Sequence, residues 1–208
     1  MKYVALDIES TGLDTEKDQV LQIGIVIDDL ADPKPLNELP TLNLYVQQDR
    51  YEGSAFALQM NNNIMKVLAG VKELPEGAIM TSQKQIEGGV FLDEDGRVVA
   101  TNNPVLDFFY RNLGTLQDKI TVAGKNAAGF DIPMLPKSIT NCFDHRVIDV
   151  GSIYLEKDDE KVPGLTKCLQ RAGVNFAISH DALGDAFSVV ECIRYRFQEA
   201  EAPECSCK

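Results

Sequence analysis

The chain has 208 residues, a length that favours one folded domain with room for an elaboration. Apolar residues make up 44% of it, enough for a sizeable core, and no apolar run approaches the roughly 18–20 residues of a membrane span. The net charge of −12 argues against a protein that coats nucleic acid, but not against an enzyme that holds a few nucleotides beside bound cations.

The first predicted elements are strands. Residues 2–8 and 20–28 are apolar and rich in β-branched side chains, and residues 41–47 alternate apolar and polar side chains. The connection between the first two runs is too short for a helical crossover, so these strands are expected to be antiparallel neighbours. Residues 55–69 follow as a predicted helix. Its apolar side chains recur at four-residue steps: Phe56, Met60, Ile64 and Leu68.

Residues 71–103 are predicted to form an insertion, in which two short apolar runs flank Asp95-Gly96. This dipeptide is typical of a β-hairpin and also of a plain surface turn. Beyond the insertion, strands alternate with helices. Helices are predicted at 104–117, 132–139, 165–174 and 182–197, a strand at 120–126, and a strand that runs into a helix at 146–155. This order predicts a mixed sheet covered by helices, in a single domain over 1–208 with a flexible tail at 200–208.

Five scattered cysteines form no CxxC pair, and the chain has only two histidines, so a zinc site is not expected. The cysteines inside apolar segments are predicted to be core residues. Acids interrupt the N-terminal segment MKYVALDIES where a secretion signal would continue its apolar stretch. The expected location is therefore the reducing cytoplasm, without a membrane partner.

Asp7 and Glu9 stand two residues apart at the end of the first predicted strand, so their side chains leave the same face. Two carboxylates this close repel each other unless a proton or a cation lies between them. Two solvated acids at a strand end are the simpler interpretation. The pair by itself does not decide between these two interpretations.

Two further acids stand beside predicted helices. Asp131 follows a strand and a loop and lies at a helix start, where an acid is also favoured as a cap. Asp185 falls within the apolar stripe of the last helix, where a carboxylate needs a cation or a hydrogen-bond partner. Asp181 is assigned as the N-cap of that helix. His180 can approach Asp185 only from the preceding loop, although a lone histidine is most often a surface or core residue.

The segments DIESTG, KNAAGFD and HDALGDA, in this order, resemble the three motifs of the DEDDh (DnaQ-like) 3′–5′ exonucleases. That family contains polymerase proofreading subunits, oligoribonuclease and RNase T. VLQIGIVI and GLTKCLQRAGV also resemble it, and the resemblance covers most of the chain except about 71–103. It implies a ribonuclease H-like α/β fold, with a mixed five-stranded sheet whose first strands are antiparallel and later ones parallel. Lys125 stands where many members have a histidine, a departure that we expect to be tolerated.

The resemblance assigns four acids to one cluster that holds two divalent cations, Mg²⁺ or Mn²⁺. These acids are Asp7, Glu9, Asp131 and Asp185. His180 would act as general base on the attacking water, because an imidazole titrates near neutrality. The implied reaction is a two-metal hydrolysis of single-stranded nucleic acid from its 3′ end, which releases nucleoside 5′-monophosphates.

Substrate contacts are implied by position. Thr11 and Gly12 are expected at the terminal sugar and its 3′-OH, where a glycine lets the backbone approach closely. Leu13 is expected to be a wedge against the terminal base. Phe130 fits either core packing or a stacking platform, and Asn126 either orients its loop or contacts the terminal nucleotide.

DNA is the favoured substrate, and oligoribonucleotides or RNA 3′ ends are the alternative. The sequence does not distinguish DNA from RNA, because no residue is recognisable as a contact to the 2′-OH. A polymerase or another replication protein is a candidate partner, and the sequence does not determine the oligomeric state.

A different class of function is a non-catalytic module that binds nucleic-acid ends or a polymerase. A degenerate site would normally have lost an acid or the histidine, and none is missing. A cation-binding acidic protein without nucleic-acid chemistry is the weakest reading, because the motifs occur in order.

Overall fold

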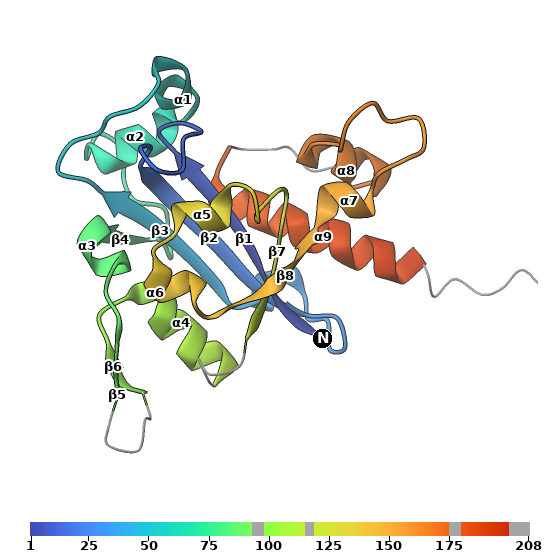
Figure 1. Cartoon of the computed structure of the whole chain (residues 1–208), viewed down its shortest axis with the longest axis horizontal. Coiled ribbons are helices and arrows are strands. Elements are labelled where there is room, and N and C mark those ends of the chain that lie inside the picture. Colours follow the sequence, from blue (N-terminus) through green and yellow to red (C-terminus); the bar gives the residue numbers. More distant parts are fainter. Residues whose placement is uncertain (93–97, 115–118, 175–179, 200–208) are drawn as a thin grey trace, which may run out of the picture.

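The computed structural model describes residues 1–92, 98–114, 119–174 and 180–199. Its centre is a mixed six-stranded sheet in the order β4-β3-β2-β1-β7-β8, with helices on both faces (Figure 1). β2 pairs antiparallel with both β1 and β3, and β7 and β8 run parallel to β1. These strands are β1 (Lys2–Ser10), β2 (Val20–Asp29), β3 (Thr41–Gln47), β7 (Ile120–Gly124) and β8 (Phe143–Asp149).

The sheet has one strand more than the sequence predicted. β4 (Ile79–Ser82) pairs parallel with β3 and lies in the segment expected to be an insertion. A separate two-stranded sheet follows, in which β5 (Val90–Leu92) and β6 (Val98–Thr101) pair antiparallel. The Asp95-Gly96 turn that was predicted to join two such strands lies outside the described residues, as does the predicted tail at the C-terminus.

Two groups of helices cover the two faces of the sheet. One face carries α4 (Pro104–Leu113), α5 (Asp131–Met134) and α6 (Lys137–Thr140). The other carries α7 (Val150–Ile153), α8 (Leu165–Arg171) and α9 (Ala182–Glu199). The helix predicted over 132–139 is split into α5 and α6, because Pro136 disfavours a helical conformation at Leu135.

β1 divides its side chains between the two faces. Val4 and Leu6 pack with α4, α5 and α6, whereas Tyr3 and Ala5 pack with α8 and α9. Successive side chains of a strand alternate between faces, so the odd-numbered positions that follow Ala5 also face α9. The first acid of that series is Asp7.

The helix predicted over 55–69 is two helices in the structure, α1 (Ala55–Met60) and α2 (Asn62–Leu68). Between them the buried side chain of Asn61 donates from Nδ2 to the carbonyl of Ser10 at 2.9 Å. This junction divides the predicted apolar stripe. Its α2 half packs in the core, and its α1 half is exposed.

The C-terminal half of α9 is fastened to the sheet by a buried ion pair. Arg194 donates from Nε and Nη2 to the two carboxylate oxygens of Asp28, at 2.9 and 2.5 Å, and the hydroxyl of Tyr3 donates to Asp28 at 2.8 Å. Burial raises the pKa of Asp28, but these hydrogen bonds outweigh it and hold the pKa below its ordinary value. The pair therefore fixes α9 against β2.

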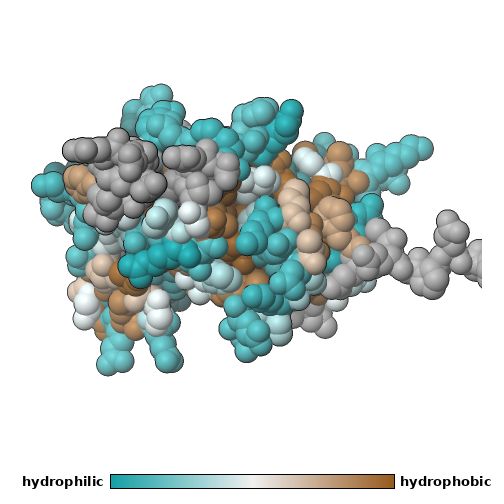
Figure 2. Space-filling view, turned by 90° about the horizontal axis from the view of Figure 1, so that it is seen from below, coloured by the Kyte–Doolittle hydropathy of each residue, from teal (hydrophilic) through white to brown (hydrophobic). Residues whose placement is uncertain are grey.

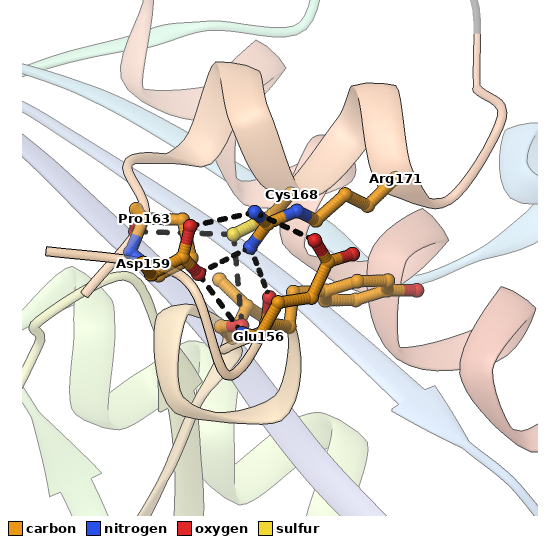
Figure 3. Close-up of polar contacts among 7 residues, drawn as sticks. Glu156, Asp159, Pro163, Cys168 and Arg171 are labelled. Carbon is orange, nitrogen blue, oxygen red and sulfur yellow. Dashed lines mark hydrogen bonds and ion pairs between the residues drawn. The ribbon is translucent and has the colours of Figure 1, made fainter. Parts of the chain in front are cut away.

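A second arginine holds the charged segment 155–163 between α7 and α8 (Figure 3). Arg171 donates to both carboxylate oxygens of Asp159 at 2.6 Å and to the carbonyl of Tyr154 at 2.6 Å. It also forms an ion pair with Glu156 at 3.0 Å. The segment is therefore tied to α8 over much of its length.

Seen from below, the surface of the molecule is mostly hydrophilic, and apolar side chains are exposed in separate patches (Figure 2). None of the helices in the described part of the chain combines the length and apolar character that a membrane crossing needs. The three described cysteines are buried free thiols, which confirms their prediction as core residues: Cys142, Cys168 and Cys192.

We expect Arg194→Ala to lower the free energy of unfolding by about 3–5 kcal/mol, because it leaves the Asp28 carboxylate buried without its ion-pair partner. Arg111→Ala is the matched control. Arg111 also pairs with an aspartate, Asp107 at 2.9 Å, but on the exposed face of α4, where the loss should be about 0.5 kcal/mol or less. Denaturant titration measures both values. Equal losses in the two variants would contradict the anchoring role of the Asp28 pair.

Candidate functional site

The C-terminal end of β1 lies beside the start of α9 (Figure 1). Carboxylates from these two elements meet there. Asp7 and Glu9 leave β1 on one face, and Asp185 reaches them from the first turn of α9. One carboxylate oxygen of each lies within 4.8 Å of the other two. Asp7 and Glu9 are both partly buried, so they are not two freely solvated acids at a strand end.

Asp131 approaches the same group from the start of α5. Its side chain is 3% exposed, and its Oδ1 accepts the backbone N–H of Ile8 at 2.9 Å. Ile8 lies between Asp7 and Glu9, so this hydrogen bond ties Asp131 directly to the strand that carries them. The N-cap position of α5 is occupied by Phe130, which excludes the interpretation of Asp131 as a helix cap.

Burial is the largest cause that raises the pKa of each of these four carboxyl groups. It raises the pKa of Asp7 well above its ordinary value, and repulsion from the other three acids adds to the effect. The pKa of Glu9 and that of Asp131 rise to about 7, and the pKa of Asp185 rises to about 6. Near neutrality the cluster therefore retains protons that exposed carboxyl groups would have lost.

One oxygen of the cluster has an unused hydrogen-bonding capacity. Oδ1 of Asp185 is buried and makes no hydrogen bond to any residue that the structure describes. A buried acceptor without a donor is unfavourable, and gathered carboxylate oxygens are the ligands that hard divalent cations prefer. These residues therefore fit Mg²⁺ or Mn²⁺, and they fit zinc less well because its sites favour nitrogen and sulfur ligands.

His180 stands immediately before α9, next to the cluster. Its φ of 47° lies in the left-handed region, which is uncommon for a residue with a side chain, and the side chain is exposed. The charge of the imidazole lowers the pKa of Glu9 and of Asp185 against the larger effect of burial, so His180 lies within electrostatic reach of both. Residues 175–179, which lead to it, lie outside the described residues.

Asp181 is a fifth carboxylate beside this group. It caps α9, as predicted, because its Oδ2 accepts the N–H of Gly184 at 3.1 Å. It also repels the cluster, since its charge is among the causes that raise the pKa of Asp7, Glu9 and Asp185, after burial. The sequence identified the cap but gave no indication of this second effect.

An apolar pocket of about 220 Å³ opens beside Glu9. Its larger apolar side chains come from β1, from the turn after it, from α1 and from the residue before α5: Ile8, Leu13, Phe56, Met60 and Phe130. Leu13 is 85% exposed and Phe56 is 73% exposed, and because both line the same pocket their exposed apolar surface is grouped, as it is in ligand-binding grooves. Sequence reasoning proposed Leu13 and Phe130 as substrate contacts and missed Phe56 and Met60, which it noted only as apolar residues at four-residue steps in a predicted helix.

Phe130 lies between the core and the pocket, a position that fits either interpretation from the sequence. It packs against the core cluster and also lines the pocket. Gly12 lines the pocket as well, and a Cβ atom there would lie 2.2 Å from the Asp18 carboxylate. Thr11 is fully buried, and its hydroxyl accepts the N–H of Gln19 at 2.9 Å. Thr11 therefore stabilises the turn from the interior of the protein and does not line the pocket.

Asn126 shapes the loop that leads to Asp131. Its φ is 61°, its N–H donates to Oδ1 of Asp149 at 2.9 Å, and its carbonyl accepts the N–H of Gly129 at 3.0 Å. Its side chain is exposed, so the backbone role is the one that the structure describes. The charge of neighbouring Lys125 lowers the pKa of Asp131, although burial outweighs it.

No protein-family model matches the chain, and no curated protein sequence matches it. Among solved structures, its fold is similar to that of cell-death related nuclease 4 (CRN-4), with a TM-score of 0.61 over 97% of this chain at 12% identity. It is also similar to E. coli exonuclease I, solved with a dT13 oligonucleotide, with a TM-score of 0.57 over 96% of this chain at 14% identity.

The matched regions make up 64% of the first of these proteins and 42% of the second, so the chain spans less than two thirds of either length. At these identities the comparison concerns the fold. The mixed sheet, antiparallel first and parallel later, with helices on both faces, is the ribonuclease H-like fold, which this chain shares with two nucleases.

Proposed function

We propose that the chain is a metal-dependent 3′–5′ exonuclease of the DEDDh type that acts on single-stranded DNA. The observation that carries the proposal is the convergence of Asp7, Glu9 and Asp185 within 4.8 Å, with Asp131 bonded to the strand between the first two. The similarity of the fold to two nucleases supports it, as does the dT13 oligonucleotide bound to one of them. RNA 3′ ends are the alternative substrate.

The four carboxylates would hold two Mg²⁺ or Mn²⁺ ions. When bound, such ions stabilise the charge that develops on the phosphate and on the attacking and leaving oxygens. Oδ1 of Asp185 is an unpartnered acceptor suited to a cation. Asp131 has one oxygen engaged by the N–H of Ile8, which leaves the second for a cation.

His180 would take a proton from the attacking water. It is exposed and within electrostatic reach of Glu9 and Asp185, so it approaches the cluster from the solvent side, where the water enters. The water oxygen forms a bond to phosphorus, and the 3′-oxygen of the penultimate nucleotide leaves. The products are a nucleoside 5′-monophosphate and a strand shorter by one nucleotide.

The apolar pocket would hold the terminal base. Leu13 and Phe56 expose apolar surface next to Glu9, so a base placed between them lies beside the carboxylates. Stacking and apolar contact tolerate every base, because each has a π-face, which suits an enzyme that removes successive nucleotides. The sugar would lie near Gly12, which lines the pocket together with Glu9.

The proposal predicts a one-nucleotide ladder from the 3′ end of 5′-labelled single-stranded DNA in Mg²⁺, and no cleavage in EDTA. RNA of the same sequence, run in parallel, tests the alternative substrate. Asp131→Asn should abolish most of the cleavage, because it removes one carboxylate from the cluster. The control Asp107→Asn changes a surface acid of α4 and should cleave at the wild-type rate. Cleavage that persists in EDTA, or in Asp131→Asn, would contradict the proposed mechanism.

The raised pKa values predict how stability depends on pH. Between pH 5 and pH 8 the metal-free folded state binds more protons than the unfolded state, because the pKa of Glu9 and of Asp131 is about 7 instead of 4.5 and 3.8. Stability should therefore fall as the pH rises through this window, and the melting temperature in EDTA should be higher at pH 5 than at pH 8.

A bound cation should offset this loss, because it replaces the protons. Mn²⁺ should stabilise the folded state at pH 8 by about 2.7 kcal/mol at 100 times its Kd. Asp7→Asn should be neutral or stabilising in EDTA and lose most of the rise in melting temperature with Mn²⁺, whereas Asp107→Asn should keep that rise. Melting temperatures that do not respond to millimolar Mn²⁺ would exclude a shared metal site.

Leu13→Ala and Phe56→Ala should each raise the KM for a short single strand by roughly 5- to 150-fold, the equivalent of one lost base contact of about 1–3 kcal/mol. The rise in melting temperature with Mn²⁺ should not change, because neither side chain is a carboxylate of the cluster. Phe91→Ala, which removes another exposed phenylalanine, from β5, is the control. Wild-type KM values in both pocket variants would refute the proposed role of the pocket.

A further inference from the structure

A fully buried glutamine joins β2 to the start of α9. Gln22 lies directly opposite Glu9 in the register of β1 and β2 and is 0% exposed. Its Nε2 donates to Oδ1 of Asp181 at 2.5 Å and to Oδ1 of Asn43 at 2.8 Å, and its Oε1 accepts the N–H of Ala182 at 3.2 Å. Because two acceptors bind the amide nitrogen of Gln22 and one donor binds its oxygen, the orientation of the amide is fixed.

These partners are the first residues of α9. Ala182 begins the helix, so its N–H is one of the donors that a helix leaves free at its N-terminus. Asp181 is the N-cap, with Oδ2 bound to the N–H of Gly184 and Oδ1 bound to Gln22. Gln22 therefore holds both the cap and the first turn of α9.

The helix start also lies unusually close to the sheet. Gly24 stands opposite Asp7 in the register, and a Cβ atom built on it would lie 2.1 Å from the carbonyl carbon of Ala182. Only a glycine permits this approach. At Gly24 the absence of a side chain thus lets the start of α9 approach β2. Two residues earlier, Gln22 forms hydrogen bonds to that helix start.

The hydrogen bonds of Gln22 act against an electrostatic repulsion. Asp181 carries a charge that raises the pKa of Asp7, Glu9 and Asp185, so it is itself pushed away from the cluster. The short hydrogen bond from Gln22 opposes that displacement. At the other end of the helix, Arg194 and Asp28 hold α9 to the same strand.

We propose that Gln22 is a positioning residue of the carboxylate cluster. It touches neither Asp185 nor His180 in the contacts that the structure describes. It holds the helix start from which Asp185 joins Asp7 and Glu9, and it holds the cap that follows His180 directly. The role in turnover rests on the proposed function, whereas the role in assembling the cation site does not.

The first test measures cation binding, with Gln22→Met, which keeps the length of the side chain and removes its polar end. Isothermal titration with Mn²⁺ at pH 8 should give a Kd about 10- to 100-fold weaker than in the wild type, the usual effect of losing a group that orients a ligand. Asn103→Ala is the matched control. Asn103 is also a fully buried amide, bonded to the carbonyls of Ile86 and Gly88, but it supports α4 on the other face of the sheet. It should lower the melting temperature and leave the Kd for Mn²⁺ unchanged.

The second test is a double-mutant cycle with His180→Ala. His180→Ala alone should lower kcat by about 10²–10⁴-fold, the range for a general base. Gln22→Met should lower kcat by about 10- to 100-fold in the wild type and by less in His180→Ala, because the part of the loss that comes from a misplaced imidazole disappears when the imidazole is removed. The KM for a short strand should stay the same, since Gln22 does not line the base pocket.

Gln22→Glu separates shape from hydrogen bonding. It keeps the shape and the acceptor for Ala182, but it places a second carboxylate against Asp181. It should be as impaired as Gln22→Met in both tests. If Gln22→Met does not fold, Gln22→Glu is the test variant, and failure of both to fold would reduce the role of Gln22 to global stability and overturn the proposal.

Wild-type affinity for Mn²⁺ in a folded Gln22→Met protein would also overturn the proposal. The outcomes for the two proposals are distinct. A wild type inactive on DNA and RNA, with Mn²⁺ binding that still depends on Gln22, refutes the nuclease and leaves the positioning role. An active wild type with an unaffected Gln22→Met variant refutes only the positioning role.

Discussion

The repulsion between carboxylates gathered at the end of β1 is the constraint on which the rest of the structure depends. Asp7 and Glu9 are fixed by the strand, Asp131 by the N–H of Ile8, and Asp185 by the position of α9. Burial and proximity raise their pKa values, so the group is held together by its surroundings and not by mutual attraction. The fold opposes this repulsion with contacts at both ends of α9, Gln22 at the start and Arg194 further on.

The proposed activity follows from two unlike surfaces that share Glu9. On one side lie the buried carboxylates, which fit hard cations. On the other lies an apolar pocket that exposes Leu13 and Phe56. A nucleotide has this same division, with an anionic phosphate at one end and an apolar base face at the other. The polar and apolar halves of the site are therefore complementary to the end of a single strand.

The secondary structure predicted from the sequence was wrong where a long-range contact interrupts a local pattern. Apolar residues at four-residue steps over 55–69 predicted one continuous helix. The structure breaks it at Asn61, because that amide bonds to the carbonyl of Ser10, and the first half of the stripe turns toward the pocket. The three consecutive asparagines at 61–63, which are poor helix formers, were the available signal. β4 was missed because four residues carry too little periodicity to stand out from a loop.

The sequence by itself determined what depends on neighbours along the chain: the strands and most helices, the shared face of Asp7 and Glu9, and the capping role of Asp181. Only the tertiary structure decided that Asp185 comes within 4.8 Å of that pair and that Gln22 holds the start of α9. The contacts of Gln22 with α9 join residues 159 and 160 positions apart. Such contacts leave no periodicity in the sequence, because a buried amide in a strand is recognised as a clamp only when its partners have packed against it.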